Sequence, residues 1–234
     1  LRTNGGSDTF NLSGEGLVQL DFRGPAVTAD LEAGTITQSG NTSTVNGTIW
    51  ELRTSNDTDS IIGTAANESF RVAGGNDTVD GGGGFDRLRY DDFGVTTING
   101  NLALGIVTGT AGGFNFTDAV ANIEWLRGSE GNDTIVGNSG ANRLQGDDGN
   151  DRLQGGLGND TIEGGSGTDT AVLAIARTEA QVSTVNGMIQ IISSEGTDKF
   201  SSIEVFEFSD GSVSAADLTS GGGVPGEVIV GTDG

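Results

Sequence analysis

The sequence predicts an all-β protein built from short stacked turns, because it carries a nine-residue repeat and lacks a long amphipathic helical pattern. Residues 128–172 read as GSEGNDTIV, GNSGANRLQ, GDDGNDRLQ, GGLGNDTIE and GGSGTDTAV without a gap. Each unit has mostly small or polar residues at positions one to four, an acid or its amide at position six, and usually an aliphatic residue at position eight. A side chain that recurs at a fixed spacing also recurs in space, so the repeat predicts a row of carboxylates along the stack.

A second array precedes this one and follows the same pattern less strictly. Its units are TSNDTDSII from Thr54, GTAANESFR from Gly63, VAGGNDTVD from Val72 and GGGGFDRLR from Gly81. A single further copy, TNGGSDTFN, begins at Thr3. The position-eight residues of both arrays are expected to fill the interior: Ile61, Phe70, Val79, Leu88, Ile135, Leu144, Leu153, Ile162 and Ala171.

Apolar packing alone is not expected to fold these arrays. One buried aliphatic side chain per repeat contributes about 2 kcal/mol, whereas ordering each backbone residue costs roughly 1–2 kcal/mol. Equivalent acids on adjacent turns would lie about 4.8 Å apart and would repel each other by roughly 3–4 kcal/mol at an effective dielectric near 20. A divalent cation between them reverses that sign, and oxygen-only ligands favour Ca²⁺. Calcium binding and folding are therefore predicted to be one event.

The tandem nonapeptides resemble the calcium-binding repeat G-G-x-G-x-D-x-U-x of RTX (repeats-in-toxin, hemolysin-type) proteins. The resemblance implies a parallel β-roll in which six residues of each unit form a loop and three form a strand. It also implies a calcium ion between each loop and the loop two repeats later, bound by the acids of both. The resulting pairs are Asp133 with Asp151, Asp151 with Asp169, Asn142 with Asp160, Asp59 with Asp77, and Glu68 with Asp86.

The same resemblance implies that backbone carbonyls complete about five such inter-loop sites. They come from positions two and four of the first loop and from positions one and three of the second. In the array at 128–172 they are Ser129, Gly131, Gly146, Asp148, Asp147, Gly149, Gly164, Ser166, Asn138, Gly140, Gly155 and Leu157. In the array at 54–89 they are Ser55, Asp57, Val72, Gly74, Thr64, Ala66, Gly81 and Gly83.

Three departures from the repeat predict weaker or strained sites. Asn142 lacks a negative charge, so the site that it shares with Asp160 should bind calcium more weakly. Glu68 carries an extra methylene, which changes its reach into the loop. Asp57 and Ala66 replace glycine at position four and are expected to strain their turns.

The arrays alternate with segments that read as β-rich inserts. The expected organisation is a partial repeat and insert at 1–53, the first array at 54–89, an insert at 90–127, the second array at 128–172, a cap at 173–218, and a linker with the start of a further repeat at 219–234. Asn46-Gly47, Asn99-Gly100 and Asn186-Gly187 predict β-hairpin turns, in hairpin or β-sandwich-like inserts. The run 200–211 resembles the strand that often closes RTX arrays, and one helical turn is expected at 214–218.

The aromatic residues outside the repeats are expected to be structural. Trp50 and Trp125 stand at matched places before each array and are interpreted as buried plugs at the ends of the roll, with stacking on sugar rings as the alternative. Tyr90, Phe114 and Phe116 are expected in the core of the insert.

Composition excludes several classes of function. The chain of 234 residues has a net charge of −22 and only 11 basic residues, which argues against nucleic acid and anionic membranes as partners. It has no histidine and no cysteine, which excludes His-dependent nucleophiles, His-ligated metals and disulfides, and no catalytic residue is expected. There is no apolar run long enough for a transmembrane helix and no visible signal peptide, and the repeats at both ends predict a piece of a longer polypeptide.

The sequence thus predicts a non-enzymatic, calcium-binding extracellular module of a secreted or cell-surface protein. The resemblance to RTX proteins implies Gram-negative type I secretion. Three uses remain open: a stretch of an adhesin, surface layer or filament that contacts copies of itself; the non-catalytic tail of a secreted protease, lipase or polysaccharide epimerase or lyase; and inserts that bind surface polysaccharide.

Overall fold

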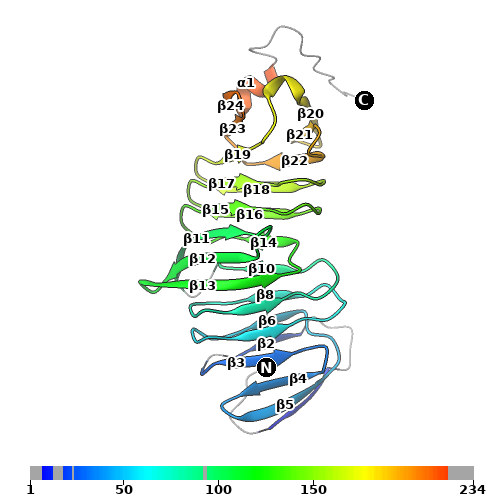
Figure 1. The fold of residues 1–234 in the computed structure, drawn as a ribbon, viewed down its shortest axis with the longest axis vertical. Helices are drawn as coiled ribbons and strands as arrows, with labels where there is room; N and C mark the ends of the chain where they lie inside the picture. Colours follow the sequence, from blue (N-terminus) through cyan, green and yellow to red (C-terminus); the bar gives the residue numbers. More distant parts are fainter. Residues whose placement is uncertain (1–6, 13–17, 23, 92–93, 221–234) are drawn as a thin grey trace.

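The computed structural model describes residues 7–12, 18–22, 24–91 and 94–220, which form one elongated roll (Figure 1). Two β-sheets run along the roll, and within the arrays successive strands alternate between them. Each array strand pairs in parallel with the strand two repeats later, as Thr134 does with Arg152. The predicted parallel β-roll is confirmed, and both arrays are part of the same roll.

The two sheets are named A and B. Among the described residues, sheet A contains, in spatial order, β1 (Thr9–Asn11), β5 (Asn41–Asn46), β4 (Thr35–Gln38), β3 (Val27–Asp30), β7 (Ser60–Ile62), β9 (Thr78–Asp80), β13 (Phe114–Ala121), β12 (Ile106–Ala111), β11 (Val95–Asn101), β15 (Thr134–Val136), β17 (Arg152–Gln154), β19 (Thr170–Val172), β23 (Val205–Phe208) and β24 (Gly211–Ser214). Sheet B contains β2 (Gln19–Asp21), β6 (Glu51–Arg53), β8 (Ser69–Arg71), β10 (Arg87–Arg89), β14 (Trp125–Arg127), β16 (Arg143–Asp148), β18 (Thr161–Ser166), β22 (Thr197–Ser201), β21 (Met188–Ile192) and β20 (Gln181–Val185).

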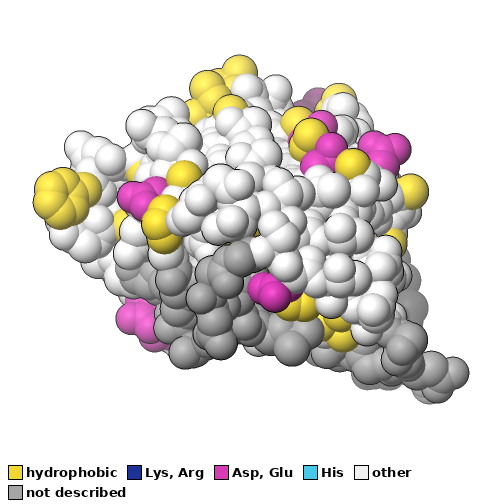
Figure 2. Space-filling view, turned by 90° about the horizontal axis from the view of Figure 1, so that it is seen from below, with side chains coloured by type: hydrophobic (Ala, Val, Ile, Leu, Met, Phe, Trp, Pro, Cys, Tyr) yellow, Lys and Arg dark blue, Asp and Glu magenta, His cyan; other side chains and the backbone are white. Residues whose placement is uncertain are grey.

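The position-eight side chains form the interior, as predicted. All nine are at most 1% exposed. In sheet B they continue into the insert and the cap, where Leu126 pairs with Leu144 and Phe200 pairs with Ile162. Where the end of the roll is seen from below, apolar side chains on the described surface occur in separate small groups (Figure 2). The position-eight apolar side chains of the repeat thus lie in the interior of the roll.

The two inserts do not form separate bodies but add antiparallel strands to sheet A. β3–β5 and β11–β13 each make a three-stranded meander, and β13 then pairs in parallel with β9 while β11 pairs with β15. The turn between β12 and β13 is Gly112-Gly113, with φ of 57° and 85°, as a tight hairpin of twisted strands requires. One end of this hairpin projects from the side of the roll (Figure 1).

Two of the three predicted hairpin turns are wrong. Asn99-Gly100 lies inside β11, where Gly100 is at the inward position opposite Ile135. A Cβ on Gly100 would lie 2.6 Å from the Leu126 side chain, so packing and not a turn requires glycine there. Asn46 ends β5, and a Cβ on Gly47 would lie 2.6 Å from the carbonyl oxygen of Leu12; the chain then crosses to sheet B.

The third predicted turn and the helical turn are confirmed. Asn186-Gly187 connects β20 to β21, which pair antiparallel. The short helix α1 (Ala215–Ser220) buries Leu218, and a 3₁₀ turn, η1 (Arg177–Glu179), precedes β20. Antiparallel strands β20–β22 and β23–β24 therefore follow the parallel strands of the second array. Residues 221–234, including most of the expected linker, lie outside the described residues.

The expectations for the aromatic residues are partly wrong. Tyr90 and Phe116 are buried and stack with ring centroids 5.7 Å apart, as expected. Phe114 is 81% exposed at the projecting hairpin. Trp50, which is 39% exposed, and Trp125 do not plug the ends of the roll. Trp125 flanks the inward residue Leu126 and so lies on the outer face of sheet B.

The asparagine at position five of the repeat joins adjacent loops by hydrogen bonds. The side-chain oxygen of Asn132 accepts a hydrogen bond from the backbone N–H of Asn150, and that of Asn150 accepts one from Thr168, both at 2.8 Å. Asn67 and Asn159 make the same bond to Phe85 and Thr197. These uncharged asparagine side chains connect adjacent loops independently of the position-six acids. Within the described chain, no helix is long and apolar enough to span a membrane.

Candidate metal sites

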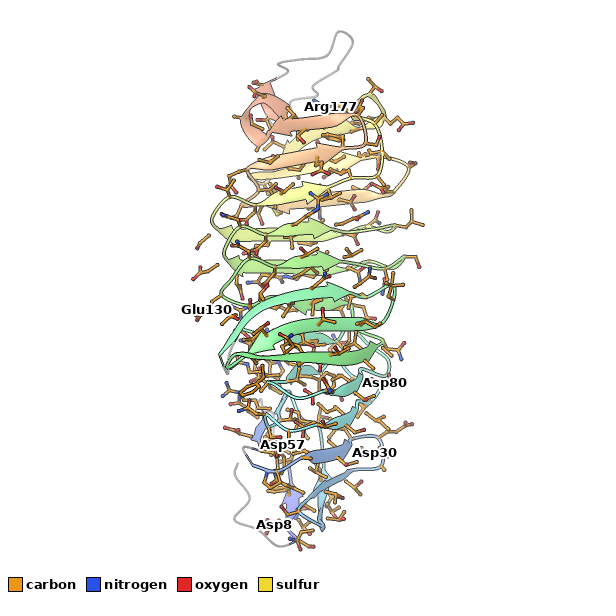
Figure 3. All side chains as sticks on the ribbon, turned by 60° about the vertical axis from the view of Figure 1, so that its left-hand side comes forward. Asp8, Asp30, Asp57, Asp80, Glu130 and Arg177 are labelled. Atoms are coloured by element: carbon orange, nitrogen blue, oxygen red, sulfur yellow. The ribbon has the colours of Figure 1, made fainter. Side chains whose placement is uncertain are left out.

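The position-six residues form two ladders, one along each edge of the roll where the loops join the sheets. The first ladder has two runs, which strands β12 and β11 separate: Asp59, Asp77 and Asp118, then Asp133, Asp151, Asp169 and Glu204. The second ladder contains Glu68, Asp86, Glu124, Asn142, Asp160 and Asp198. Every predicted position-six residue is at most 4% exposed. Acids elsewhere in the loops, such as Asp57 and Glu130, are exposed on the outside (Figure 3). The repeat therefore buries one particular carboxylate per turn.

Each ladder is held by one oxygen of each carboxylate. The backbone N–H of Asp133 donates to Asp151 Oδ1 at 2.8 Å, and that of Asp151 donates to Asp169 Oδ1 at 2.9 Å. The same bond joins Asn142 to Asp160, Asp59 to Asp77, and Glu68 to Asp86. All five predicted pairs are thus brought onto adjacent turns. Calcium ligation by these pairs remains a prediction.

The second carboxylate oxygen is left without a partner in five of these acids. The Oδ2 atoms of Asp77, Asp86, Asp151, Asp160 and Asp169 are buried and accept no hydrogen bond. A buried charged oxygen without a partner is costly, because the group has lost its water and gained nothing in return. The edges of the roll therefore contain oxygen atoms that require a further positive partner.

Loop carbonyls lie beside these oxygens at the position-one glycines. A Cβ on Gly146 would overlap Asp151 Oδ2 and lie 2.6 Å from the carbonyl oxygen of Gly164. A Cβ on Gly128 would likewise meet both Asp133 Oδ2 and the Gly146 carbonyl oxygen. A Cβ on Gly137 would meet the Gly155 carbonyl oxygen and Asn142 Oδ1, and one on Gly63 would meet the Gly81 carbonyl oxygen and Glu68 Oε2. Glycine at position one thus leaves a small cradle in which a carboxylate oxygen and a carbonyl oxygen converge.

Carbonyls from positions two and four point along the roll toward the next turn. Each position-four carbonyl faces the position-four glycine of the loop two repeats later; these carbonyls belong to Asp57, Ala66, Gly131, Gly140 and Gly149. In the same way, position-two carbonyls face the position-two glycine of that loop, at Thr64, Asn138 and Asp147. Those glycines have positive φ, for example 124° at Gly149 and 119° at Gly158. The position-three carbonyl of Ser166 accepts a hydrogen bond from the Gly149 N–H at 2.9 Å.

The first loop on each edge of an array is closed in a different way. In these loops the position-two side chain accepts a hydrogen bond from the position-four N–H, as Ser129 Oγ does from Gly131 and Thr64 Oγ1 from Ala66. The position-two N–H also donates to the acid, as from Ser129 to Asp133 Oδ2 at 2.6 Å. The expected strain at Asp57 and Ala66 is wrong, because neither residue has a positive φ. Side-chain hydrogen bonds thus help to close these first loops.

Glu68 reaches its loop despite the extra methylene. Its Oε2 accepts a hydrogen bond from the Thr64 N–H at 2.9 Å, and its Oε1 is bonded to the Thr64 hydroxyl. Asn142 Oδ1 accepts from the Asn138 N–H at 2.7 Å in the same way. Both departures from aspartate therefore occupy the geometric position of the ladder acid.

Burial shifts the titration of the ladder acids. Loss of solvent, together with the charge of neighbouring carboxylates, raises the pKa of Asp77 to about 8 and that of Asp151 to about 7. Burial also raises the pKa of Asp133 and Asp160 to about 6, against the lowering effect of backbone hydrogen bonds. These directions show that the ladders disfavour negative charge when no cation is present.

Four members of the ladders lie outside the nonapeptides, and sequence reasoning missed them. Asp118, Glu124, Asp198 and Glu204 accept hydrogen bonds from the N–H groups of Asp77, Asp86, Asp160 and Asp169, respectively. Each of the four stands two residues before an inward apolar residue, namely Val120, Leu126, Phe200 or Phe206. That spacing is the signal that identifies them. Asp118 differs from the others because its second oxygen accepts the Tyr90 hydroxyl at 2.7 Å.

The donor set fits a hard divalent cation. No group of three carboxylates is close enough to form a metal cage within the described residues, so carboxylate oxygens alone do not supply the six or more ligands that calcium takes. The unpartnered carboxylate oxygens and the adjacent loop carbonyls are the oxygen ligands that calcium prefers. The residues present therefore fit the metal that the repeat implies.

Comparison with known protein families agrees with this geometry. Residues 53–88, 119–146 and 136–171 match the family model of the RTX calcium-binding nonapeptide repeat (4 copies). The matched segments contain all five predicted acid pairs and also include Asp80, Ala121 and the ladder residue Glu124. No curated protein matched the chain.

Proposed function

We propose that this chain, which carries RTX calcium-binding nonapeptide repeats, is a non-catalytic module that becomes a rigid rod when calcium binds along both edges of the roll. The observation that carries this proposal is the set of buried Oδ2 atoms without a partner at Asp77, Asp86, Asp151, Asp160 and Asp169. At Asp86, Asp151 and Asp169 this oxygen lies beside a backbone carbonyl oxygen, in space that a Cβ on the position-one glycine would fill. Calcium-binding repeats are present in the chain; calcium-driven folding is the step that we add.

The five predicted pairs would hold the ions, and three further pairs extend them. Glu124, Asp198 and Glu204 stand one turn beyond Asp86, Asp160 and Asp169, respectively. Each of these latter aspartates has an unpartnered oxygen. Calcium would supply the positive charge that offsets desolvation and repulsion between the carboxylates. We exclude Asp118 from this extension, because Tyr90 already occupies its second oxygen.

We further propose that the module acts outside the cell as part of a larger secreted or surface protein. Extracellular calcium modules bind at about 10⁻⁴–10⁻³ M, far above the level of free cytosolic calcium. A chain with a net charge of −22 would therefore stay unfolded inside the cell and fold after export, which suits type I secretion. Labelling of intact cells that express the full-length protein tests this location, and signal only after lysis would contradict it.

A rod-like spacer, as in an adhesin or surface layer, is the use that the fold supports best. The inserts join sheet A by parallel pairing on both sides, at β9 with β13 and at β11 with β15. The roll therefore continues through the insert without a hinge, so repeated insert-and-array units would lengthen one rod.

Small-angle X-ray scattering of the isolated chain tests the proposal. In EGTA we expect the profile of an expanded chain, and in calcium the profile of an elongated rigid particle, with magnesium having no such effect. A particle of the same shape in EGTA and in calcium would contradict the proposed function.

A further inference from the structure

The outer face of sheet B carries most of the basic side chains of this acidic chain. In each three-residue strand, the residues that flank the inward position point outward. Seven of the 11 lysine and arginine residues are at such positions in sheet B: Arg53, Arg71, Arg87, Arg89, Arg127, Arg143 and Lys199. The corresponding face of sheet A has Arg152 alone among the described array strands. One face therefore concentrates positive charge.

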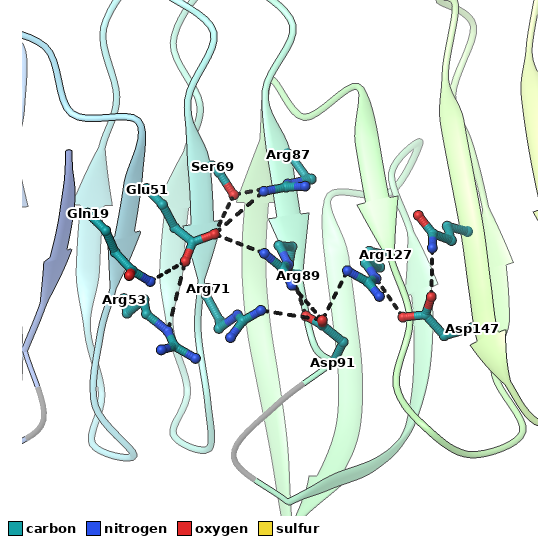
Figure 4. A network of polar contacts seen from close by, with 11 residues as sticks. Gln19, Glu51, Arg53, Ser69, Arg71, Arg87, Arg89, Asp91, Arg127 and Asp147 are labelled. Atoms are coloured by element: carbon teal, nitrogen blue, oxygen red, sulfur yellow. Dashed lines mark hydrogen bonds and ion pairs between the residues drawn. The ribbon is translucent and has the colours of Figure 1, made fainter. Parts of the chain in front are cut away.

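Acids on the same face neutralise part of this charge. Arg89 contacts Glu51 at 2.9 Å and Asp91 at 2.5 Å, and Arg127 contacts Asp147 at 2.6 Å (Figure 4). Arg87 and Arg143 have longer contacts, at 3.5 Å to Glu51 and 3.4 Å to Glu163. The Arg143 and Glu163 side chains are 40% and 38% exposed, and an exposed pair of this kind contributes little. Arg87 also donates from Nε to Ser69 Oγ at 3.0 Å and its side chain is 14% exposed, so only part of its guanidinium is open to another anion, whereas Arg143 is more open.

These two arginines form a stacked column with the two tryptophans. The Arg87 Cζ atom lies 5.4 Å from the ring centre of Trp50 and 4.7 Å from that of Trp125. Arg143 Cζ lies 4.1 Å from the Trp125 ring centre. Stacking on an indole holds a guanidinium plane in place while leaving its N–H edge able to pair with a carboxylate or sulfate. The column therefore pre-organises two anion-binding groups.

A groove of about 350 Å³ runs beside the column. Its walls include Trp50 and Phe85, each 39% exposed, together with Asn67, Arg87 and Arg143. The volume is within the range of small-molecule sites. Flat aromatic surfaces, an amide and two arginines are thus available to one ligand.

We propose that this groove binds a segment of an acidic polysaccharide. A sugar ring lies against the exposed faces of Trp50 and Phe85, and its carboxylate or sulfate pairs with Arg87 and Arg143. An acidic peptide would satisfy the arginines but has no ring to cover the two aromatic faces, so the glycan is the better match. Repulsion from the net charge of −22 is short-ranged at physiological salt, where the Debye length is about 8 Å.

Isothermal titration of the calcium-loaded chain with a galacturonate tetrasaccharide tests this site. Free calcium is held constant, and the tetrasaccharide is short enough to avoid calcium gelation. The Arg87→Ala/Arg143→Ala double variant should weaken binding by at least about tenfold, because it removes both charged hydrogen-bond donors. The matched control, Arg152→Ala/Arg177→Ala, makes the same charge change away from the groove and should stay within about twofold of the unmodified chain.

Three outcomes would overturn the proposal. They are absence of galacturonate binding, equal binding of neutral cellotetraose, and equal binding of a hexa-aspartate peptide, which would show an acidic-peptide site instead. Calcium-induced circular dichroism of every variant checks folding separately, so failure of the groove is distinct from failure of calcium binding. If the double variant does not fold, Arg143→Gln and Trp50→Ala alter exposed side chains singly, and unchanged affinity in both would equally overturn the site.

Discussion

The interior of the roll and its two edges are equally buried but stabilised in opposite ways. Leu153 is 0% exposed and Asp151, two residues earlier, is 2% exposed. The leucine gains by leaving water, whereas the aspartate loses hydration and has one oxygen without a partner. The comparison shows that the same repeat supplies a thin apolar core and a charged edge that opposes the fold until a cation binds.

Asp151→Ala should cause the largest loss of stability, because Asp151 belongs to two of the predicted calcium sites at the edge of the roll. At calcium about 100-fold above Kd, each lost site removes about 2.7 kcal/mol of stability, so the two together remove about 5 kcal/mol. Chemical unfolding in calcium measures the loss, and equilibrium dialysis should show two fewer bound ions. Asn142→Ala is the comparison; a larger loss from Asn142→Ala than from Asp151→Ala would show that the acid pairs are wrongly assigned.

Leu153→Ala should follow, with a loss of about 2–5 kcal/mol from the cavity that it leaves. The change is in the interior, so the number of bound calcium ions at saturation should be that of the unmodified chain. Unfolding and dialysis on the same samples separate the two regions. Fewer ions bound by Leu153→Ala at saturation would show that interior and edge are not separable.

Acidification should stabilise the calcium-free roll and weaken calcium binding. Burial raises the pKa of Asp77 to about 8 and that of Asp151 to about 7, above the values of an unfolded chain. The folded state therefore binds more protons, and its stability falls as pH rises through that window and returns as pH falls. Circular dichroism in EGTA from about pH 8 to about pH 5 should show a gain of β structure. The calcium midpoint should rise over the same interval, and a constant midpoint would contradict the role of these carboxylates.

Asn142→Asp should have the smallest effect of these changes, and it should strengthen calcium binding instead of weakening it. It restores a charge beside Asp160 without changing the loop, so calcium should bind that site about tenfold more tightly. Calcium titration calorimetry measures this gain. Gln154→Glu, on the outer face of β17, adds the same charge away from the edge and should leave the affinity unchanged; an equal gain there would indicate a general charge effect.

The sequence predicted the parts of the fold that depend on a constant spacing. The interior row that includes Leu144 and Leu153 follows from the nine-residue period. The pairing of Asp133 with Asp151 follows from the resemblance to RTX repeats, which implies that facing loops are two repeats apart. The period fails in the inserts, where Asp198 lies next to Asp160 although 38 residues separate them. Their contact depends on strand register, which no local pattern states.

Other errors arose where one residue type serves two physical purposes. The pair Asn99-Gly100 resembles a hairpin turn, yet Gly100 is needed because Leu126 leaves no space for a side chain. Trp125 resembles a core residue by size, but alternation along β14 places it outside, against Arg87 and Arg143. In both cases, contacts with residues that are distant in the sequence determine which residue the position requires or where its side chain lies.

Calcium titration followed by far-ultraviolet circular dichroism, with magnesium as the parallel series, tests the central claim most directly. We expect a cooperative gain of β structure with calcium, none with magnesium, and complete reversal by EGTA. A chain that keeps the same β signal after exhaustive dialysis against EGTA would contradict the claim, since its buried carboxylates would then need no cation.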